Sequence, residues 1–282
     1  MSSDTAGGKA PPPMKGISAK DADIINQILE PTRPQVKHGI TVNEGFRFIC
    51  LGETGSGKTS LMRAVVYSAL QQQLAEFALV HDTKGIFPEY PRSVILPNTA
   101  SFVARGFQRG DPPVVSFRGD VRNDVDCSAE EVAAFAKLLL KNGTIRRING
   151  VETWAPRPIV TVIDELAEAS MAGRKHFNAP SVVWLLEQGR KVGGSIVGTT
   201  QSPRKVPLDM LGQASSYAMF RLTGADANFL GDRLELDPAM IAAVRGPNNE
   251  GLPNYKFVIA IKGKPWDHEI HSLDPKTVRL FE

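Results

Sequence analysis

One segment of the sequence has the residue types and the spacing that are needed to hold a chain of phosphates. Residues 52–59 read Gly-Glu-Thr-Gly-Ser-Gly-Lys-Thr and fit the pattern G-x-x-x-x-G-K-[S/T]. The glycines let the backbone curl until successive N–H groups face phosphate oxygens, and a helix that begins at the same place adds positive potential. Lys58 would reach the β- and γ-phosphates, and the Thr59 hydroxyl would be a ligand for Mg²⁺. The predicted nucleotide-binding residues are Gly52, Glu53, Thr54, Gly55, Ser56, Gly57, Lys58, Thr59 and Ser60.

Two adjacent carboxylates follow an apolar run later in the chain. Residues 158–163 read Pro-Ile-Val-Thr-Val-Ile, which predicts a buried strand, and Asp164 and Glu165 come directly after it. Because strand side chains alternate in direction, the two carboxylates cannot do the same task. We expect Asp164 to contact Mg²⁺ directly or through a water, and Glu165 to orient and deprotonate a water that attacks the γ-phosphate. The alternative is a solvated strand end with no part in chemistry.

The residue types around this site favour one nucleotide and one reaction. A carboxylate base favours hydrolysis over transfer of the phosphoryl group to a small acceptor. The guanine-reading pattern Asn-Lys-x-Asp is absent from the sequence, so we expect ATP rather than GTP. Gln201 follows the strand predicted over residues 195–199, and the carboxyl ends of neighbouring parallel strands line one crevice. Gln201 is therefore predicted to contact the γ-phosphate or the attacking water; a polar residue that only starts a loop is the alternative.

The elements that must position these residues alternate along the chain from residue 46 onward. The nucleotide pattern lies between a predicted strand and a predicted helix, a context that argues against an ordinary glycine-rich turn. Several strands are too apolar to be half exposed, which indicates an α/β fold with a mostly parallel sheet and helices on both faces. The predicted strands are 46–51, 77–81, 93–96, 114–117, 159–163, 195–199, 217–222 and 256–261, and the predicted helices are 21–29, 60–73, 182–191 and one that begins after residue 128.

Local patterns also predict two helix starts and one core face. Asp21 is expected to cap the first helix, and Ser128 with Glu131 forms a capping box at the start of another. The core face of this second helix is expected to contain Val132, Phe135, Leu138 and Leu139.

Composition divides the chain into three parts. Residues 1–35 are predicted to form a flexible arm followed by a short helix, because the first 20 residues hold three consecutive prolines, small residues and lysines, with almost nothing to bury. Residues 36–262 are predicted to form one ATPase domain, and residues 263–282 a C-terminal hairpin or tail.

The overall composition is ordinary for a globular protein, with 42% hydrophobic and 22% charged residues among 282. The longest apolar runs fall far short of the ~20 residues of a membrane span, and we expect no signal peptide because the N-terminus lacks an apolar core. Cys50 and Cys127 are too few for a disulfide framework or a zinc site, so a reducing, cytoplasmic setting is expected. The net charge of +3 permits binding to nucleic acid without arguing for it.

Taken together, these motifs resemble the FtsK/HerA superfamily of DNA-pumping ATPases over roughly residues 40–262. The most specific part is a helix end, Gly189-Arg190-Lys191-Val192-Gly193, followed by a strand that ends in Thr200-Gln201. The other matching parts are residues 52–59, Asp82-x-Lys84-Gly85, Asp164-Glu165 and Phe220-Arg221-Leu222. The resemblance implies a RecA-like P-loop NTPase core, subunits that form a ring, usually a hexamer, and ATP bound between neighbouring subunits.

The resemblance also implies a role for an arginine. Arg190 or Arg221 would act as a finger or sensor on the γ-phosphate, and one of them would reach the nucleotide of a neighbouring subunit. An arginine in such a place stabilises the charge that develops on the phosphoryl oxygens. Both assignments stay open, and for Arg190 with Lys191 the alternative is an ordinary helix end, where cations complement the helix dipole.

A compact motor of this kind is most similar to the genome-packaging ATPases of tailless viruses with an internal membrane. The resemblance then implies a Mg²⁺-dependent ATPase ring that translocates double-stranded DNA in the host cytoplasm and docks on a capsid-vertex or membrane portal protein. A translocase or coupling ATPase of a mobile element, or a cellular HerA-like motor, stays open. Rivals from other classes are a small-molecule kinase or GTPase on the same loop, and an ATP-dependent assembly module that does not translocate.

A ring motor grips the phosphate backbone of DNA, so its contacts should be basic and carried by loops. Single-stranded DNA would require several aromatic residues among these charges, and only Phe107 qualifies, so double-stranded DNA is the expected track. Each basic pair can equally be an ordinary solvated surface. The predicted DNA-binding residues are Arg105, Arg109, Arg146, Arg147, Arg204 and Lys205.

Overall fold

A computed structural model provides the structure of the chain. It describes residues 18–29, 35–37, 40–42, 44–82, 93–106, 108, 111–118, 127–148, 151–155, 157–167, 179–246, 250–264 and 269–273. Within these ranges, the description of residues 35–37, 40–42, 144–148 and 151–155 covers the backbone.

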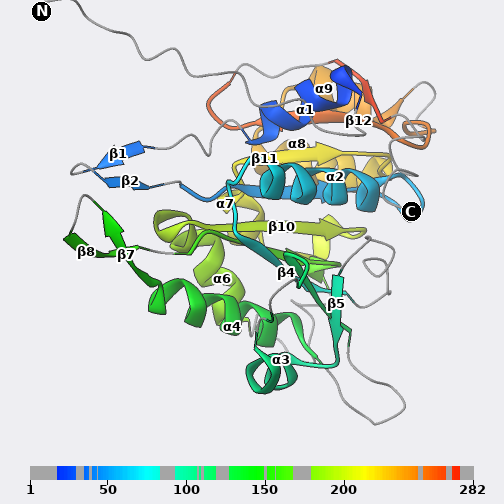
Figure 1. Ribbon diagram of the computed structural model, residues 1–282. Helices are drawn as coiled ribbons and strands as arrows, with labels where there is room; N and C mark the ends of the chain where they lie inside the picture. Colours follow the sequence, from blue (N-terminus) through cyan, green and yellow to red (C-terminus); the bar gives the residue numbers. More distant parts are fainter. Residues whose placement is uncertain are drawn as a thin grey trace, which may run out of the picture.

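A nine-stranded sheet forms the centre of the molecule (Figure 1). In spatial order its strands are β13 (His271–Ser272), β12 (Lys256–Ile261), β11 (Ser216–Met219), β3 (Arg47–Leu51), β10 (Gly194–Thr200), β9 (Ile159–Ile163), β4 (Phe77–His81), β6 (Val114–Phe117) and β5 (Ser93–Leu96). All neighbours from β11 to β5 are parallel, and β12 and β13 pair antiparallel at one edge. The mostly parallel sheet predicted from the apolar runs is confirmed.

Helices cover the sheet, and two small hairpins accompany it. The helices are α1 (Ala19–Leu29), α2 (Lys58–Gln71), α3 (Thr99–Arg105), α4 (Ala129–Asn142), α6 (Pro180–Glu187), α7 (Leu208–Gln213), α8 (Gly224–Leu234) and α9 (Pro238–Arg245), with 3₁₀ turns at η4 (Gly189–Val192) and η5 (Pro203–Lys205). The hairpins pair β1 (Gln35–Lys37) with β2 (Ile40–Val42) and β7 (Thr144–Ile148) with β8 (Val151–Ala155). We predicted neither hairpin, and helices α3, α7, α8 and α9 were also not predicted.

Buried side chains fall into two clusters, one against each face of the sheet. On β3, Phe48 and Cys50 belong to the cluster that includes α1 and α2. Ile49 and Leu51 belong to the cluster that includes α3, α4 and α6 to α9. The alternation follows from the pleat, which sends successive side chains to opposite faces. Figure 1 shows α2 on one side of the central strands and α4 and α6 on the other. Coverage on both faces explains why β4, β9 and β10 are buried along their whole length.

Most strand boundaries agree with the sequence pattern, and two predicted elements are too long. The strands predicted over 77–81, 93–96, 114–117, 159–163 and 256–261 are observed with those bounds. The strand predicted over 217–222 is wrong at its end, because β11 stops at Met219 and the next residues run beside the glycine-rich loop. The helix predicted over 182–191 is also too long, because α6 stops at Glu187 and a 3₁₀ turn follows.

The core face predicted for α4 is partly wrong. Val132 and Phe135 are buried as expected, and Leu139 packs partly buried against the same cluster. Leu138 is 52% exposed, whereas Leu140 is fully buried. The buried face of this helix therefore continues through Leu140, because the neighbouring leucines at 138–140 point in different directions around the helix axis.

The predicted helix caps are also corrected in part. The backbone N–H of Asp21 donates to the Ser18 hydroxyl at 3.1 Å, so Ser18 caps α1 and Asp21 lies buried in its first turn. At α4, the Ser128 hydroxyl accepts from the Glu131 N–H at 3.1 Å, as a capping box requires. The Glu131 carboxylate, however, accepts from the N–H and hydroxyl of Thr99, so this box is half formed and its acid instead ties α4 to the start of α3.

Described parts of both flanking segments pack with the central region. Isoleucines of α1 lie in the same buried cluster as α2, and β13 pairs with β12 in the main sheet. The division of the chain at residues 35 and 262 stays a prediction. In the described ranges, no helix is both long enough and apolar enough to cross a membrane.

Candidate nucleotide-binding site

The predicted nucleotide pattern forms a loop between the end of β3 and the start of α2. Its backbone requires glycine at both ends. Gly52 has φ +152° and a Cβ there would lie 2.7 Å from the Phe220 Cβ; Gly57 has φ +110° and its Cβ would lie 2.9 Å from the Tyr255 ring. Gly57 also occupies the N-cap of α2, where no described side chain caps the helix, and the first turn carries no acidic residue. The loop therefore presents uncapped helix N–H groups, the feature that binds anions.

Lys58 lies folded over this loop. Its side chain is 7% exposed, and Nζ donates to the carbonyl oxygens of Gly52 at 2.6 Å and Glu53 at 2.8 Å. Below the loop, burial raises the pKa of the Cys50 thiol, and the Lys58 ammonium offsets part of that rise. Cys50 is thus a neutral packing residue, and the ammonium is held where a bound phosphate chain would need a cation.

The two predicted carboxylates lie buried directly after β9, which β10 separates from β3 in the sheet. Asp164 accepts from the Thr199 hydroxyl at 3.1 Å. Glu165 is 5% exposed, has φ +68°, and accepts from the Thr200 hydroxyl at 2.7 Å and the Gln201 N–H at 3.1 Å. The left-handed backbone of Glu165 is unusual for a residue with a Cβ and places the two carboxylates on different partners.

The end of β10 connects these carboxylates to the loop. The Thr200 carbonyl accepts from the Gly52 N–H at 3.1 Å, and the Gln201 side-chain oxygen accepts from the Thr54 hydroxyl at 2.6 Å. Glu165 therefore contacts the same two residues that hold the loop. The structure brings together the loop, Glu165 and Gln201 at the carboxyl ends of β3, β9 and β10, as expected for neighbouring parallel strands.

The structure separates the two arginines that the sequence left open. Arg221 lies beside the loop, where its Nε donates to Glu53 Oε2 at 2.9 Å and its carbonyl accepts from the Glu53 N–H. Arg190 lies in η4, before β10 begins, where its carbonyl accepts from the Gly45 N–H and its Nε is 3.4 Å from Glu44 Oε2. The length of β10 places Arg190 roughly 20 Å from the loop. Arg221 thus lies at the glycine-rich loop of its own chain, whereas Arg190 lies at the opposite end of β10.

The remaining strand end in the resemblance is only partly described. Asp82, directly after β4, is fully buried, accepts from the Ser116 hydroxyl at 3.1 Å and lies 3.7 Å from Arg118 Nε. Lys84 and Gly85 lie outside the described residues.

The predicted DNA-binding residues whose side chains the structure describes differ in ion pairing and in exposure to solvent. Both guanidinium Nη atoms of Arg105 donate to Asp111 at 2.7 Å, and this bonding holds the pKa of the Asp111 carboxyl below its usual value. Arg105 is thus already paired, which argues against it as a free phosphate contact. Arg204 is 56% exposed although its Nε contacts Asp226 at 2.6 Å, and Lys205 is exposed. Arg109 and the side chains of Arg146 and Arg147 lie outside the described residues.

The residues that hold the two carboxylates were not predicted from the sequence. Thr199 and Thr200 contact Asp164 and Glu165 because β9 and β10 are parallel with Gly198 opposite Ile163. That register places each threonine beside one carboxylate. A parallel pairing of these two strands, which the sequence did suggest, was the available signal.

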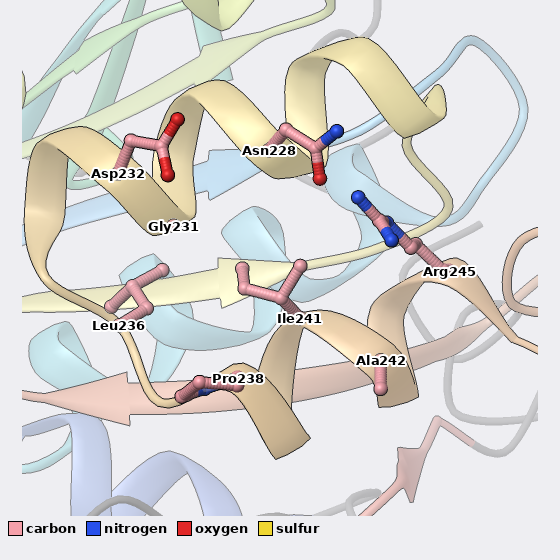
Figure 2. A pocket seen from close by; sticks show the side chains of 8 residues that line it. All are labelled: Asn228, Gly231, Asp232, Leu236, Pro238, Ile241, Ala242 and Arg245. Carbon is pink, nitrogen blue, oxygen red and sulfur yellow. The ribbon is translucent and has the colours of Figure 1, made fainter.

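A separate hollow of about 290 Å³ lies between α8 and α9 (Figure 2). Figure 2 shows the Arg245 side chain near Asn228, with Asp232 further along the same helix. The Arg245 carbonyl accepts from the N–H of Gly251. A Cβ on Gly251 would lie 2.3 Å from Arg221 Cγ, so Gly251 packs directly against the arginine beside the loop.

Comparison with known proteins identifies relatives in structure only. No family model and no curated sequence matches the chain. The structure is similar to the genome-packaging NTPase B204 of Sulfolobus turreted icosahedral virus 2 in complex with ATPγS, with 16% identity, a TM-score of 0.54, and coverage of 83% of this chain and 99% of that chain. It is also similar to VirB4 of Thermoanaerobacter pseudethanolicus, with 8% identity, a TM-score of 0.57, and coverage of 84% and 91%.

These neighbours and the geometry of the loop define the class of fold. The chain has a RecA-like P-loop NTPase fold, as predicted. At these identities the likeness concerns the fold. Its structural neighbours are consistent with the resemblance to FtsK/HerA-type P-loop ATPases and to viral packaging ATPases.

Proposed function

We propose that this protein is a Mg²⁺-dependent ATPase that assembles into a ring of six copies and moves double-stranded DNA into a virus particle. The observation that carries the proposal is an uncapped helix start with a buried lysine over it, and a buried glutamate after β9 that bonds to the end of the intervening strand β10. The fold neighbours, one of them a viral genome-packaging NTPase, support the choice of cargo.

In this proposal the phosphate chain lies on the N–H groups of residues 52–60. Lys58 exchanges its two carbonyl contacts for β- and γ-phosphate oxygens. Thr59 and Asp164 offer hydroxyl and carboxylate oxygens, the ligand types that Mg²⁺ prefers, and these residues would hold the ion. Bound there, Mg²⁺ would neutralise part of the phosphate charge.

Hydrolysis needs a water and a base, and Glu165 is the proposed base. Its carboxylate takes a proton from the water whose oxygen attacks the γ-phosphorus, while the bond from that phosphorus to the bridging oxygen of ADP breaks. Gln201, which already touches the loop through Thr54, would orient the water. Arg221 would leave Glu53 to contact the γ-phosphate of its own chain, and Arg190 would serve the nucleotide of a neighbouring copy.

The DNA contacts proposed are basic residues on loops. Arg204 and Lys205 are exposed shortly after β10, on the side of the sheet where the strands end at the nucleotide loop. Arg109, Arg146 and Arg147 remain candidates. We further propose a host-cytoplasmic location and docking on a capsid-vertex or membrane portal protein.

The test is the rate of ATP hydrolysis with and without duplex DNA, together with the mass by light scattering in the presence of an ATP analogue. We expect DNA to stimulate turnover of an oligomer. Glu165→Gln should keep ATP affinity and lose about 10²- to 10⁴-fold in kcat, whereas the exposed control Glu250→Gln should match the wild type.

Three other outcomes would contradict the proposal, and two of them indicate a specific rival. Turnover that ignores DNA but requires a soluble phosphoryl acceptor would indicate a small-molecule kinase. Ring formation with ATP and no DNA-stimulated turnover would indicate an assembly module. A monomer whose turnover is insensitive to DNA contradicts the motor.

A further inference from the structure

The two oxygens of the Glu165 carboxylate accept different numbers of hydrogen bonds. Oε1 accepts from the Thr200 hydroxyl at 2.7 Å, and from the backbone N–H groups of Gln201 at 3.3 Å and Ala167 at 3.4 Å. Oε2 accepts from the Gln201 N–H at 3.1 Å, its one hydrogen bond among the described residues. Since a carboxylate oxygen offers about two lone-pair positions, Oε1 is fully engaged and Oε2 keeps one position open.

The direction of the Thr200 hydroxyl is fixed by a second bond. Its oxygen accepts from the Ser202 N–H at 3.1 Å, so its own proton is the part that remains for Glu165. Thr200 has no exposed surface, which keeps water from competing for this proton. The shortest of the hydrogen bonds to Glu165 is therefore also the most strongly directed.

The neighbouring threonine acts on the backbone instead of the side chain. The Glu165 N–H donates to the Thr199 hydroxyl at 3.2 Å, and that hydroxyl donates to Asp164 Oδ1 at 3.1 Å. Thr199 thus supports the left-handed backbone at Glu165, and Thr200 supports the carboxylate. The hydroxyls of two adjacent threonines therefore position the backbone and the carboxylate of Glu165 separately.

We infer that Thr200 is a positioning residue for hydrolysis: its hydroxyl anchors Oε1 of Glu165 and so leaves Oε2 as the oxygen that receives the proton of the attacking water. The inference rests on the proposed function, in which Glu165 is the base. As Oε2 gains that proton, the water oxygen bonds to the γ-phosphorus and ADP leaves with the electron pair of the broken bond. Without the anchor, the carboxylate can rotate and share its two oxygens among the remaining N–H donors.

Substitutions at Thr200 can separate this role from binding and from folding. The contact of Thr200 with the loop uses its carbonyl, which accepts from the Gly52 N–H and which every substitution keeps. Thr200→Val keeps the shape and removes the hydroxyl, whereas Thr200→Ser keeps the hydroxyl. We expect Thr200→Val to lower kcat by about 10- to 100-fold at unchanged KM, because small misplacements of a catalytic group have effects of this size. Thr200→Ser should stay close to the wild type.

A double variant shows whether Thr200 works through Glu165. Steady-state kinetics of the full chain, affinity for a fluorescent non-hydrolysable ATP analogue, and the melting temperature are measured for Thr200→Val, for Glu165→Gln and for both together. We expect the double variant to be no slower than Glu165→Gln alone. If valine disturbs folding, comparison of Thr200→Ser with Thr200→Ala isolates the effect of the hydroxyl, because both variants lack the γ-methyl group of threonine.

The outcomes distinguish the two levels of the proposal. Wild-type turnover in Thr200→Val, while Glu165→Gln is inactive, overturns the role of Thr200 and leaves the base assignment intact. A further loss from Thr200→Val in the Glu165→Gln background also overturns it, since the effect then does not pass through Glu165. A wild-type chain that hydrolyses no nucleotide overturns the proposed function together with this inference.

Discussion

At the scale of single residues, Lys58 is the group whose removal should weaken nucleotide binding most directly. Its ammonium bonds to two carbonyls of the loop, and a charged hydrogen-bond donor at such a place contributes about 1.5–3 kcal/mol. Lys58→Ala is therefore expected to reduce ATP affinity by about 10- to 100-fold. Isothermal titration calorimetry measures this loss, and the control is Lys256→Ala, which replaces an exposed lysine. An affinity equal to that of the wild type would remove Lys58 from the phosphate site.

The residues of the site were predictable to different degrees. The loop and Glu165 follow from local patterns, because the backbone and strand-end chemistry require those residue types in that order. The threonines that hold the carboxylates depend on strand register, which a local pattern does not contain. The choice between the two arginines depends on which end of the parallel strands each one lies near, and only the three-dimensional path of the chain decides that.

At the scale of elements, α4 provides a matched pair of substitutions. Leu138 is 52% exposed and Leu140 is fully buried, although the helical pattern assigned the first of them to the core. Leu138→Ala is expected to change the free energy of unfolding by less than about 0.5 kcal/mol. Leu140→Ala is expected to lower it by about 2–5 kcal/mol, because it removes buried apolar surface and leaves a cavity.

Urea unfolding of the two α4 variants measures both effects through the shift of the midpoint. Equal shifts, or a larger one for Leu138→Ala, would contradict the orientation of the helix. A partner protein that covers Leu138 would raise the cost of Leu138→Ala only in its presence, so the measurement is made on the isolated chain.

Elements that the sequence did not predict are those that depend on their neighbours. Helix α8 contains two glycines, which lowers its intrinsic helix propensity. One of them, Gly231, lies at a close contact between the two helices, since a Cβ there would lie 3.1 Å from Ile241 Cγ1 of α9. Strands such as β4 and β9 were predictable because burial on both faces leaves a continuous apolar run, whereas α8 and α9 stabilise each other and show little pattern alone.

At the scale of the whole molecule, the nucleotide loop and Arg190 lie at opposite ends of the parallel strands, the loop after β3 and Arg190 before β10. We therefore expect Arg190→Gln to bind ATP normally and to lose turnover by about 10³-fold or more, the effect of removing an arginine finger. Mixing this variant with Lys58→Ala should restore turnover, because one chain then supplies an intact loop and the other an intact arginine. Lys191→Gln, at the exposed neighbouring position, is the control.

ATPase rates of the two variants alone and mixed provide the measurement. A mixture no faster than the sum of its parts would show that Arg190 does not act between copies. Full turnover of Arg190→Gln by itself would leave the arginine with only its contact to Glu44.

The placement of Arg190 and the loop at opposite ends of the strands has a consequence for the orientation of the copies in a ring. If the surface that carries Arg190 in each copy contacts the surface that carries the nucleotide loop in the next, neighbours meet through two different surfaces, and no two-fold axis relates them. Every copy in a closed circle then faces the same way along the central axis. Such a circle has two unlike rims, so the polarity of travel along a duplex would follow from the direction of the parallel strands in a single chain.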